Sequence, residues 1–297
     1  MDHARLEEVP EAAAVGRTAE IYKDIRATLR TTQVGLLFRT LAVHQAYFEA
    51  TWATLRPNAS ISYFERCADG LRMRTIPPLP SDVPDHEEEL EGLGYSEDQV
   101  AEIAGVIEVY NYVLPKELML AAALKGSLNG LKIGDVKPGF EEDLRPLSEG
   151  PPSSMRTPRL ADPSLAEGKT AGMFGDLQKR FGSEFVADLW RALGHFPDYL
   201  ELVLPFLEEE MAKKGFEITV SLSQGAAGAA AQEFPFPVDL SRERALETGC
   251  AGEELDGIDR KIDHLIHLIP RTHTALLFLK AAVVGEGRVR HIPFEGE

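Results

Sequence analysis

The sequence predicts an all-α fold made of two tandem helical repeats, which pack as a pseudo-twofold pair with a site between them. The first half aligns with the second half at an offset of 152 positions, which places Tyr22 on Phe174 and Asp24 on Asp176. Apolar residues recur at helical spacing, and no segment alternates convincingly between apolar and polar residues. A helical unit that is used twice is expected to pack against its own copy.

The composition limits the classes of partner. The chain has 297 residues, of which 44% are hydrophobic, so it can bury a large core. Its 48 acidic and 31 basic side chains give a formal net charge of −17, which disfavours nucleic acid and anionic membranes as partners. A small anionic ligand would therefore need hydrogen-bond donors placed close to it.

Helical periodicity is clear along the first repeat. Apolar residues four positions apart form two series, Ile21, Ile25 and Leu29, and then Tyr63, Cys67 and Leu71. Between these series, the i, i+3, i+4, i+7 spacing of one buried helix face is followed by Val34, Leu37, Phe38 and Leu41. Each of these series is typical of a helix with one buried face.

The last helical region of each repeat carries a proline at a matching place. Ser96 and Gln99 form a capping box, which predicts a helix that runs through Ile107. In this region the offset between the repeats is 155, and it pairs Pro115 with Pro270. Each proline precedes a cation and a long apolar run, which predicts that it begins a new helix, where its missing N–H is not needed.

A long linker joins the repeats. Residues 132–168 contain six prolines and show no periodicity, as is typical of an irregular crossover. The predicted division is a first repeat at 1–131, the linker at 132–168 and a second repeat at 169–297. Within the second repeat, a helix is predicted from Ser183 to Gly194.

The sequence predicts a cytoplasmic protein. The segment Met1–Glu8 is acidic and lacks an apolar run, so a signal peptide is not expected. The most apolar stretch, 118–124, is far shorter than the ~20 residues of a membrane span. Cys67 and Cys250 belong to no motif and are not related by the repeat, which is typical of reduced thiols.

Positions where the two repeats differ in chemical character are the candidates for function. Asp188 aligns with Leu36, which is flanked by Leu37 and Phe38. A leucine at this place indicates a covered helix face, so a carboxylate there would be partly desolvated. The alternative interpretation is a solvated face on which Asp188 pairs with Arg191.

Three stretches of the chain resemble a known family. They are residues 21–30, the group 111–112 with 115–116, and the run from Ala187-Asp188 to Pro197. In these stretches the chain resembles the group I 2-haloacid dehalogenases, which are all-helical enzymes of two fused repeats that act on 2-haloalkanoic acids. The similarity extends over roughly residues 21–279.

The resemblance implies a mechanism in which Asp188 activates a water that attacks the halogen-bearing carbon directly. Such a displacement needs an aligned nucleophile, a fixed base and donors for the departing halide. The resemblance implies neither a cofactor nor a metal, and it implies a small anionic substrate. It also implies a homodimer, although the sequence alone leaves the oligomeric state open.

The resemblance further implies a substrate pocket that is lined by Gln33, Leu36, Asn111, Leu114, Ala187, Leu265 and Ile269. Several positions differ in type from the family: a tryptophan is replaced by Gln33, a phenylalanine by Leu36, a water-holding asparagine by Leu114, two tyrosines by Glu117 and Leu265, and a serine by Ala187. Asp188 and Ile269 keep the family type. The chain therefore has fewer donors for water and halide than the family pattern.

Other polar groups are weaker candidates. His264 and His267 lie one helical turn apart, which permits joint metal coordination, but Pro270 is expected to redirect the chain before His273 can join them. His195 follows Asp188 by seven residues, and it is an alternative base.

The same residues also permit two other functional hypotheses. In the first, Asp188 itself attacks carbon and forms an ester. In the second, the chain is a non-catalytic or diverged binding protein that kept the duplicated fold. A solvated Asp188 that pairs with Arg191, with no cavity beside it, would favour the second hypothesis.

Overall fold

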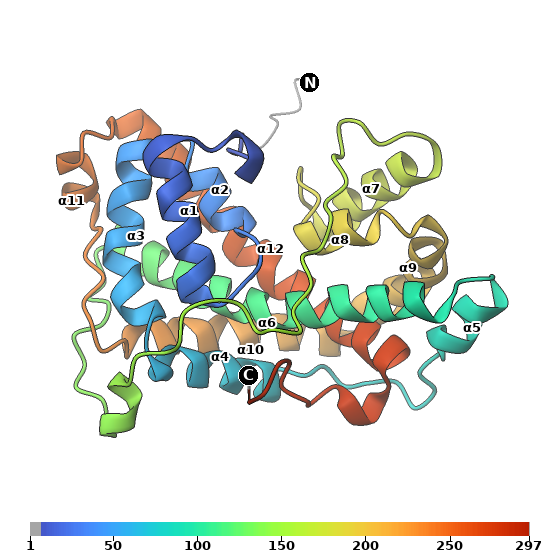
Figure 1. Ribbon diagram of the computed structural model, residues 1–297. Helices are drawn as coiled ribbons and strands as arrows, with labels where there is room; N and C mark the ends of the chain where they lie inside the picture. The colour runs from blue at the N-terminus through green and yellow to red at the C-terminus, as the bar shows by residue number, and fades with distance from the viewer. Residues whose placement is uncertain (1–6, 297) are drawn as a thin grey trace.

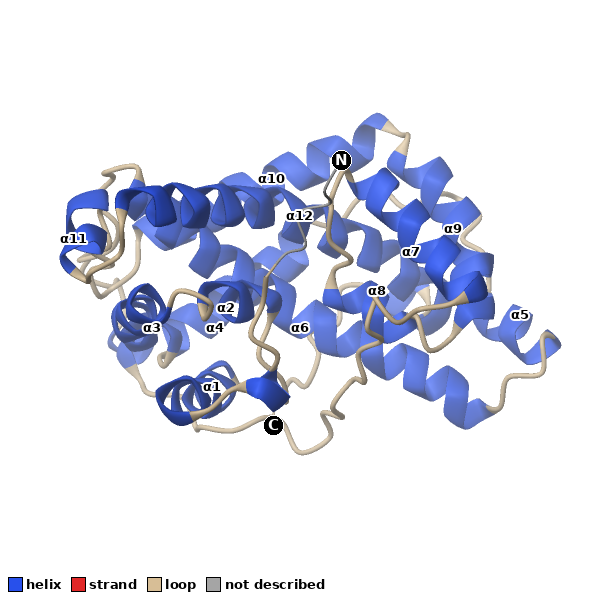
Figure 2. Ribbon diagram, turned by 90° about the horizontal axis from the view of Figure 1, so that it is seen from above, coloured by secondary structure: helices blue, strands red, loops and turns tan. Residues whose placement is uncertain are grey.

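The computed structural model describes residues 7–296, and every regular element in that range is a helix (Figure 2). The one strand-like pairing there is an isolated bridge between Ile61 and Pro146. The prediction of an all-α fold is therefore confirmed. The segment in which no signal peptide was expected lies for the most part outside the described residues.

Within residues 7–296 the helices follow one another as two sets of six, and equivalent helices have similar lengths except that α10 is longer than α4 (Figure 1). The first set is α1 (Gly16–Leu29), α2 (Leu36–Leu41), α3 (Gln45–Ala59), α4 (Ser62–Arg74), α5 (His86–Gly92) and α6 (Glu97–Leu128). The second set is α7 (Gly168–Phe181), α8 (Asp188–Leu193), α9 (Pro197–Met211), α10 (Lys214–Gln232), α11 (Arg242–Glu247) and α12 (Gly252–Val284). Short 3-10 turns lie at Glu11–Ala13, Glu141–Leu144 and Glu286–Arg288.

The long helices α6 and α12 pack along each other and form the centre of the molecule (Figure 1). The two sets are interlocked around this pair. Helix α5 of the first set packs on α9 and α12 of the second, where His86 meets Tyr199 edge to face at a ring separation of 6.0 Å. Phe234, which follows α10 of the second set, packs on Phe64 of the first set, with 6.0 Å between the ring centroids.

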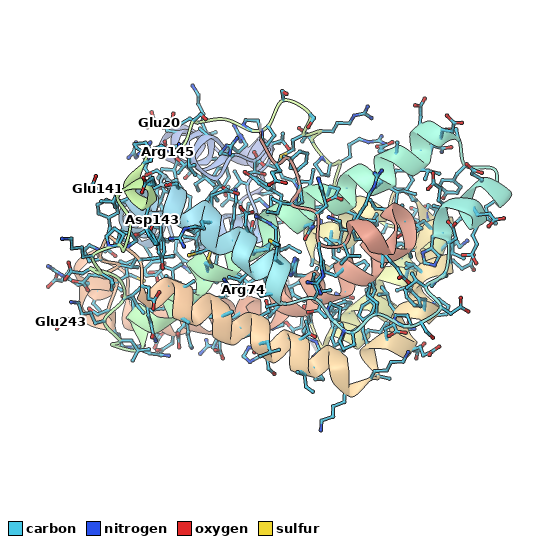
Figure 3. All side chains as sticks on the ribbon, turned by 90° about the horizontal axis from the view of Figure 1, so that it is seen from below. Glu20, Arg74, Glu141, Asp143, Arg145 and Glu243 are labelled. Atoms are coloured by element: carbon cyan, nitrogen blue, oxygen red, sulfur yellow. The ribbon has the colours of Figure 1, made fainter. Side chains whose placement is uncertain are left out.

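The crossover between α6 and α7 runs over the surface of the first set and then reaches the second (Figure 1). Around Asp143 and Arg145 it lies against the start of α4, where Asp143 pairs with Arg66 and the Arg145 carbonyl accepts the Ser62 N–H at 2.9 Å (Figure 3). Near its end, the Ala161 N–H donates to the Arg191 carbonyl at 3.1 Å. The division into domains at 131/132 and 168/169 stays a prediction.

The prediction that Pro115 and Pro270 each begin a helix is wrong, because both lie inside continuous helices. A proline inside a helix leaves the carbonyl four residues earlier without its N–H donor. The Asn111 carbonyl, freed by Pro115, accepts Arg72 Nε at 3.0 Å. The Ile266 carbonyl, freed by Pro270, accepts Gln224 Nε2 at 3.0 Å.

Arg72 and Gln224 occupy equivalent positions in the two repeats. In both repeats, therefore, a side chain from a neighbouring helix donates to the carbonyl that the proline leaves without a donor. We expect Arg72→Met to lower the free energy of unfolding by about 3 kcal/mol, because it also removes a buried counter-charge for Asp69. Gln224→Met should cost about 1 kcal/mol. Urea unfolding of both variants measures the difference, and equal costs would contradict this account.

The N-terminal part of the helix predicted at Ser183–Gly194 is not helical, because α8 begins only at Asp188. Residues 183–187 approach it as irregular chain. None of the helices in residues 7–296 combines the length and the apolar character that a membrane crossing requires.

Candidate active site

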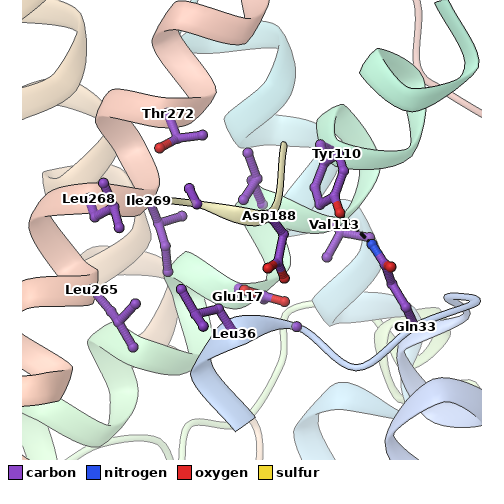
Figure 4. A pocket seen from close by; sticks show the side chains of 13 residues that line it. Gln33, Leu36, Tyr110, Val113, Glu117, Asp188, Leu265, Leu268, Ile269 and Thr272 are labelled. Carbon is purple, nitrogen blue, oxygen red and sulfur yellow. Dashed lines mark hydrogen bonds between the residues drawn. The ribbon is translucent and has the colours of Figure 1, made fainter. Parts of the chain in front are cut away.

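A small cavity of about 30 Å³ lies between the two sets of helices (Figure 4). Its lining comes from both repeats and consists of Gln33, Gly35, Leu36, Tyr110, Val113, Leu114, Glu117, Ala187, Asp188, Leu265, Leu268, Ile269 and Thr272. A volume of this size has room for one or two water molecules.

The lining has the twofold symmetry of the repeat. Twelve of the thirteen residues form six equivalent pairs, which are Gly35 and Ala187, Leu36 and Asp188, Tyr110 and Leu265, Val113 and Leu268, Leu114 and Ile269, and Glu117 and Thr272. On α6 and on α12 these residues follow the i, i+3, i+4, i+7 spacing of one helix face. The cavity therefore lies on the pseudo-twofold axis, and its polar groups mark where the symmetry is broken.

Asp188 and Leu36 face this cavity from equivalent places. Each is the first residue of a six-residue helix, α8 or α2, and each follows a residue with extended backbone. Asp188 is only 6% exposed. The expectation that a carboxylate replaces a buried leucine at this position agrees with the geometry.

Arg39 of α2, in the first repeat, binds both oxygens of the Asp188 carboxylate in the second repeat. Its Nη1 donates to Asp188 Oδ2 at 2.9 Å, and its Nη2 donates to Oδ1 at 2.8 Å. Burial alone would lower the pKa of Arg39, but the charges of Asp188 and Glu8 raise it on balance. This guanidinium therefore stays charged and fixes the orientation of the carboxylate.

The equivalent arginine, Arg191, has no carboxylate at the place of Leu36, so it is used differently. It donates to Glu8 Oε1 at 3.0 Å and to the Ala161 carbonyl at 3.0 Å, and it reaches Asp188 Oδ1 only at 3.4 Å. The alternative interpretation of Asp188 as a solvated partner of Arg191 does not fit this geometry.

A second carboxyl group, that of Glu117 on α6, lies beside Asp188 in the cavity (Figure 4). Burial raises the pKa of Glu117 to about 8, with a further rise from the charge of Asp188 and an opposing effect of Arg39. A Cβ atom at residue 35 would fall 1.3 Å from Glu117 Oε1, so Gly35 leaves the space that this carboxyl occupies.

Three further polar groups complete the site. Gln33 Nε2 donates to the Tyr110 hydroxyl at 2.6 Å. Burial and, after it, the charge of Asp188 raise the pKa of Tyr110 well above its ordinary value, so this hydroxyl keeps its proton. The Thr272 hydroxyl is buried without a hydrogen-bond partner among the described residues.

Six of the seven residues expected in the pocket line the cavity, namely Gln33, Leu36, Leu114, Ala187, Leu265 and Ile269. The placement of Asn111 in the pocket is wrong. Asn111 lies off the helix face formed by Tyr110, Leu114 and Glu117, and its side chain meets His273 Nε2 at 3.1 Å instead.

The histidines lie elsewhere. His264 and His267 line a separate open cleft with Arg260 and Asp263, and His264 Nε2 meets Ser183 Oγ at 3.0 Å. Across residues 7–296, no group of three or more histidine, cysteine or acidic side chains is placed to hold a metal ion. His195 is exposed beyond the end of α8, outside the cavity lining.

The sequence-based reasoning missed Tyr110, Thr272 and the site role of Arg39, and it noted Glu117 only as a difference from the family. Comparison of the repeats could have found Tyr110, Glu117 and Thr272. At the 155-residue offset Tyr110 aligns with Leu265, and Glu117 aligns with Thr272, so the chemical character differs at both positions. Arg39 gave no such signal, since its equivalent is also an arginine.

Fold and site together define a duplicated all-helical protein with a buried aspartate on its pseudo-twofold axis. Residues 32–161 match the model of a family described as halocarboxylic acid dehydrogenase DehI. An (R)-2-haloacid dehalogenase of Pseudomonas putida is 25% identical over 260 residues, which cover 85% of this chain and 84% of the relative. A configuration-inverting 2-haloacid dehalogenase of Pseudomonas sp. (strain 113) is 28% identical over 218 residues, which cover 72% of this chain and 70% of the relative.

Solved structures share the fold of this chain. A D-2-haloacid dehalogenase mutant superposes with a TM-score of 0.87 at 23% identity, over 93% of this chain and 95% of the other. A complex of D-2-haloacid dehalogenase with L-LA gives the same TM-score at 22% identity and the same coverage of both chains. These matches support the resemblance of the chain to the group I 2-haloacid dehalogenase family.

Proposed function

We propose that the protein is a hydrolase that releases halide from short 2-haloalkanoic acids, with Asp188 as the general base. The observation that carries this proposal is the buried Asp188 carboxylate, fixed by Arg39, at the edge of a water-sized cavity. The names of the relatives, which are 2-haloacid dehalogenases, support the same reaction.

In the proposed step, a water in the cavity donates a proton to Asp188 as its oxygen bonds to C2 of the acid. The bond between carbon and halogen breaks at the same time, and the halide leaves with the electron pair. Asp188 Oδ2 accepts one Arg39 N–H and keeps a lone pair for the water, whereas Oδ1 accepts Arg39 at 2.8 Å and also Arg191 at 3.4 Å. A carboxylate held in this way is better suited to fix a water than to leave its partner and attack carbon itself.

The size of the cavity favours short substrates. Because it holds only one or two waters as it stands, a three-carbon acid requires apolar side chains such as Leu36 and Leu265 to move apart. Longer acids would displace more of the packed lining, so the catalytic efficiency should fall with chain length.

The direct test is halide release from each enantiomer of 2-chloropropionate. We expect chloride and lactate in equal amounts, with inverted configuration at C2, because water attacks from the side opposite the halogen. Chloroacetate should be accepted and 2-chlorohexanoate should be poor. If no short haloacid yields halide, the dehalogenase assignment is removed while the fold stands.

The ester alternative is tested in the same assay with a single turnover in heavy-oxygen water. Attack by water places the label in lactate and leaves Asp188 unlabelled. Label in the Asp188 carboxylate would instead show that the aspartate had formed an ester.

The expected partner and compartment remain inferences. A cytoplasmic location rests on Cys67 and Cys250, which are both unpaired thiols. A homodimer rests on the family resemblance, and light scattering of the purified protein would measure its mass.

A further inference from the structure

The cavity must accept an anion without a free cation, and this requirement rests on the proposed function. None of the cavity-lining residues in the described chain is a lysine, an arginine or a histidine. Arg39 is the cation with the shortest contacts to Asp188, and four of its five N–H groups already donate to the protein, through Nε to Glu8, Nη1 to Val34 and Asp188, and Nη2 to Asp188.

The charges around Asp188 are already balanced. Glu8 and Asp188 contribute two negative charges, and Arg39 and Arg191 contribute two positive charges. The formal sum is zero, so this network offers no surplus positive charge to a carboxylate. An ionised Glu117 would make the cavity negative and would repel any acid that entered it.

The neutral oxygen donors of the cavity can take the place of a cation. The Tyr110 hydroxyl accepts from Gln33, which leaves its own proton for a ligand, and the Thr272 hydroxyl has no partner in the part of the chain described. Glu117 lies beside Asp188 in the same cavity, at the position equivalent to Thr272, so an O–H on Glu117 would face the ligand.

We propose that Glu117 is a substrate-binding residue that is held in its acid form and donates a hydrogen bond to the carboxylate of a short monocarboxylic acid in the cavity. Asp188 then serves as the ionised member of a carboxyl pair and Glu117 as the neutral member. Two carboxyl groups in one desolvated site favour a single negative charge, as in other paired carboxyl sites.

This assignment makes binding dependent on pH. The charged and titratable groups that face Glu117 are Asp188 on α8, Arg39 on α2 and Tyr110 on α6 itself. From α12, the lining residues Leu265, Leu268, Ile269 and Thr272 do not titrate. With the pKa of Glu117 raised to about 8, the acid form predominates at neutral pH and is lost as the pH rises through that value.

The test uses propionate, a short acid that cannot lose a halide, and isothermal titration calorimetry in buffers of different ionisation enthalpy. For the wild-type protein, we expect the Kd of propionate to rise by about tenfold per pH unit above pH 8, with uptake of one proton on binding. Glu117→Gln keeps a donor without a titrating group, so it should bind propionate with no proton uptake and little change between pH 6.5 and 9.5. Glu117→Ala should bind weakly throughout.

A matched control separates Glu117 from the other donors. Tyr110→Phe removes a cavity hydroxyl that does not titrate in this range, so it should weaken binding but keep the proton uptake. Proton uptake that persists in Glu117→Gln, or a wild-type Kd that is constant from pH 6.5 to 9.5, would overturn the proposal. Absence of propionate binding at pH 6.5 would also overturn it.

Thermal unfolding gives a second readout that does not depend on activity. Because burial favours the acid form in the folded state, the wild type should lose stability as the pH rises from about 4.5 to about 8, and Glu117→Gln should not. The difference in Tm between Glu117→Gln and the wild type should therefore shift by several degrees in favour of the variant between about pH 4.5 and pH 8.

The outcomes distinguish this proposal from the proposed function. Propionate binding with proton uptake, but no halide release from any haloacid, would support the role of Glu117 and reject the dehalogenase. Halide release with a catalytic efficiency that is constant from pH 6.5 to 9.5, and no proton uptake, would reject only the role of Glu117.

Discussion

Asp188→Asn should lower kcat for halide release by about 10³- to 10⁴-fold, because the amide cannot accept a proton from water. The fold should survive the change. Arg39 keeps Glu8 as an ion-pair partner through Nε at 2.8 Å, and the asparagine oxygen can still accept one of its N–H groups. We expect the free energy of unfolding to change by only about 1 kcal/mol.

Asp24→Asn is the matched control for this variant. Asp24 also accepts an arginine, since Arg56 Nε donates to it at 2.7 Å, but it lies on α1 and does not line the cavity. Its amide variant should release halide at the wild-type rate. If Asp188→Asn retained more than a tenth of the wild-type kcat, Asp188 could not be the base, and the water would need another proton acceptor.

The internal repeat explains how much of the site could be predicted. Aligning the halves singled out Asp188 against Leu36, and the structure brings those two residues to one cavity on the pseudo-twofold axis. The same comparison at the 155-residue offset singles out Glu117 against Thr272 and Tyr110 against Leu265. These pairs show that the sequence contained most of the polar lining, provided that the comparison was extended to α6 and α12.

The errors have a common physical origin in contacts between distant segments. Asn111 was placed by similarity of residue type, although helix phase turns it away from Tyr110 and Leu114 toward His273. Pro115 was expected to start a helix, because the sequence does not show that Arg72 from α4 would satisfy the carbonyl that this proline frees. Such rescue by a remote side chain becomes visible only once the helices are packed.

The role of Arg39 was hidden for a different reason. It matches Arg191 in the second repeat, and a comparison that searches for differences passes over identical residues. The asymmetry lies in the contacts of the two arginines, since Arg39 donates twice to the Asp188 carboxylate, whereas Arg191 donates to Glu8 and to the Ala161 carbonyl. Identical residues at equivalent positions therefore have different roles.

Arg39→Met should lower the free energy of unfolding by about 3–5 kcal/mol at pH 7, because it leaves the Asp188 carboxylate, which is 6% exposed, without its main counter-charge. Arg191→Met is the matched variant on the equivalent residue. It should cost only about 1 kcal/mol, since Arg191 is more exposed and reaches Asp188 only at 3.4 Å. Urea unfolding of the two variants at the same pH gives the comparison.

The double variant Arg39→Met with Asp188→Leu isolates the cause. It removes both charges and places at residue 188 the leucine that the first repeat carries at Leu36, so it should recover about 2 kcal/mol or more of the lost stability. A double variant no more stable than Arg39→Met would mean that packing of the Arg39 side chain, and not its charge, stabilises the interface between the repeats.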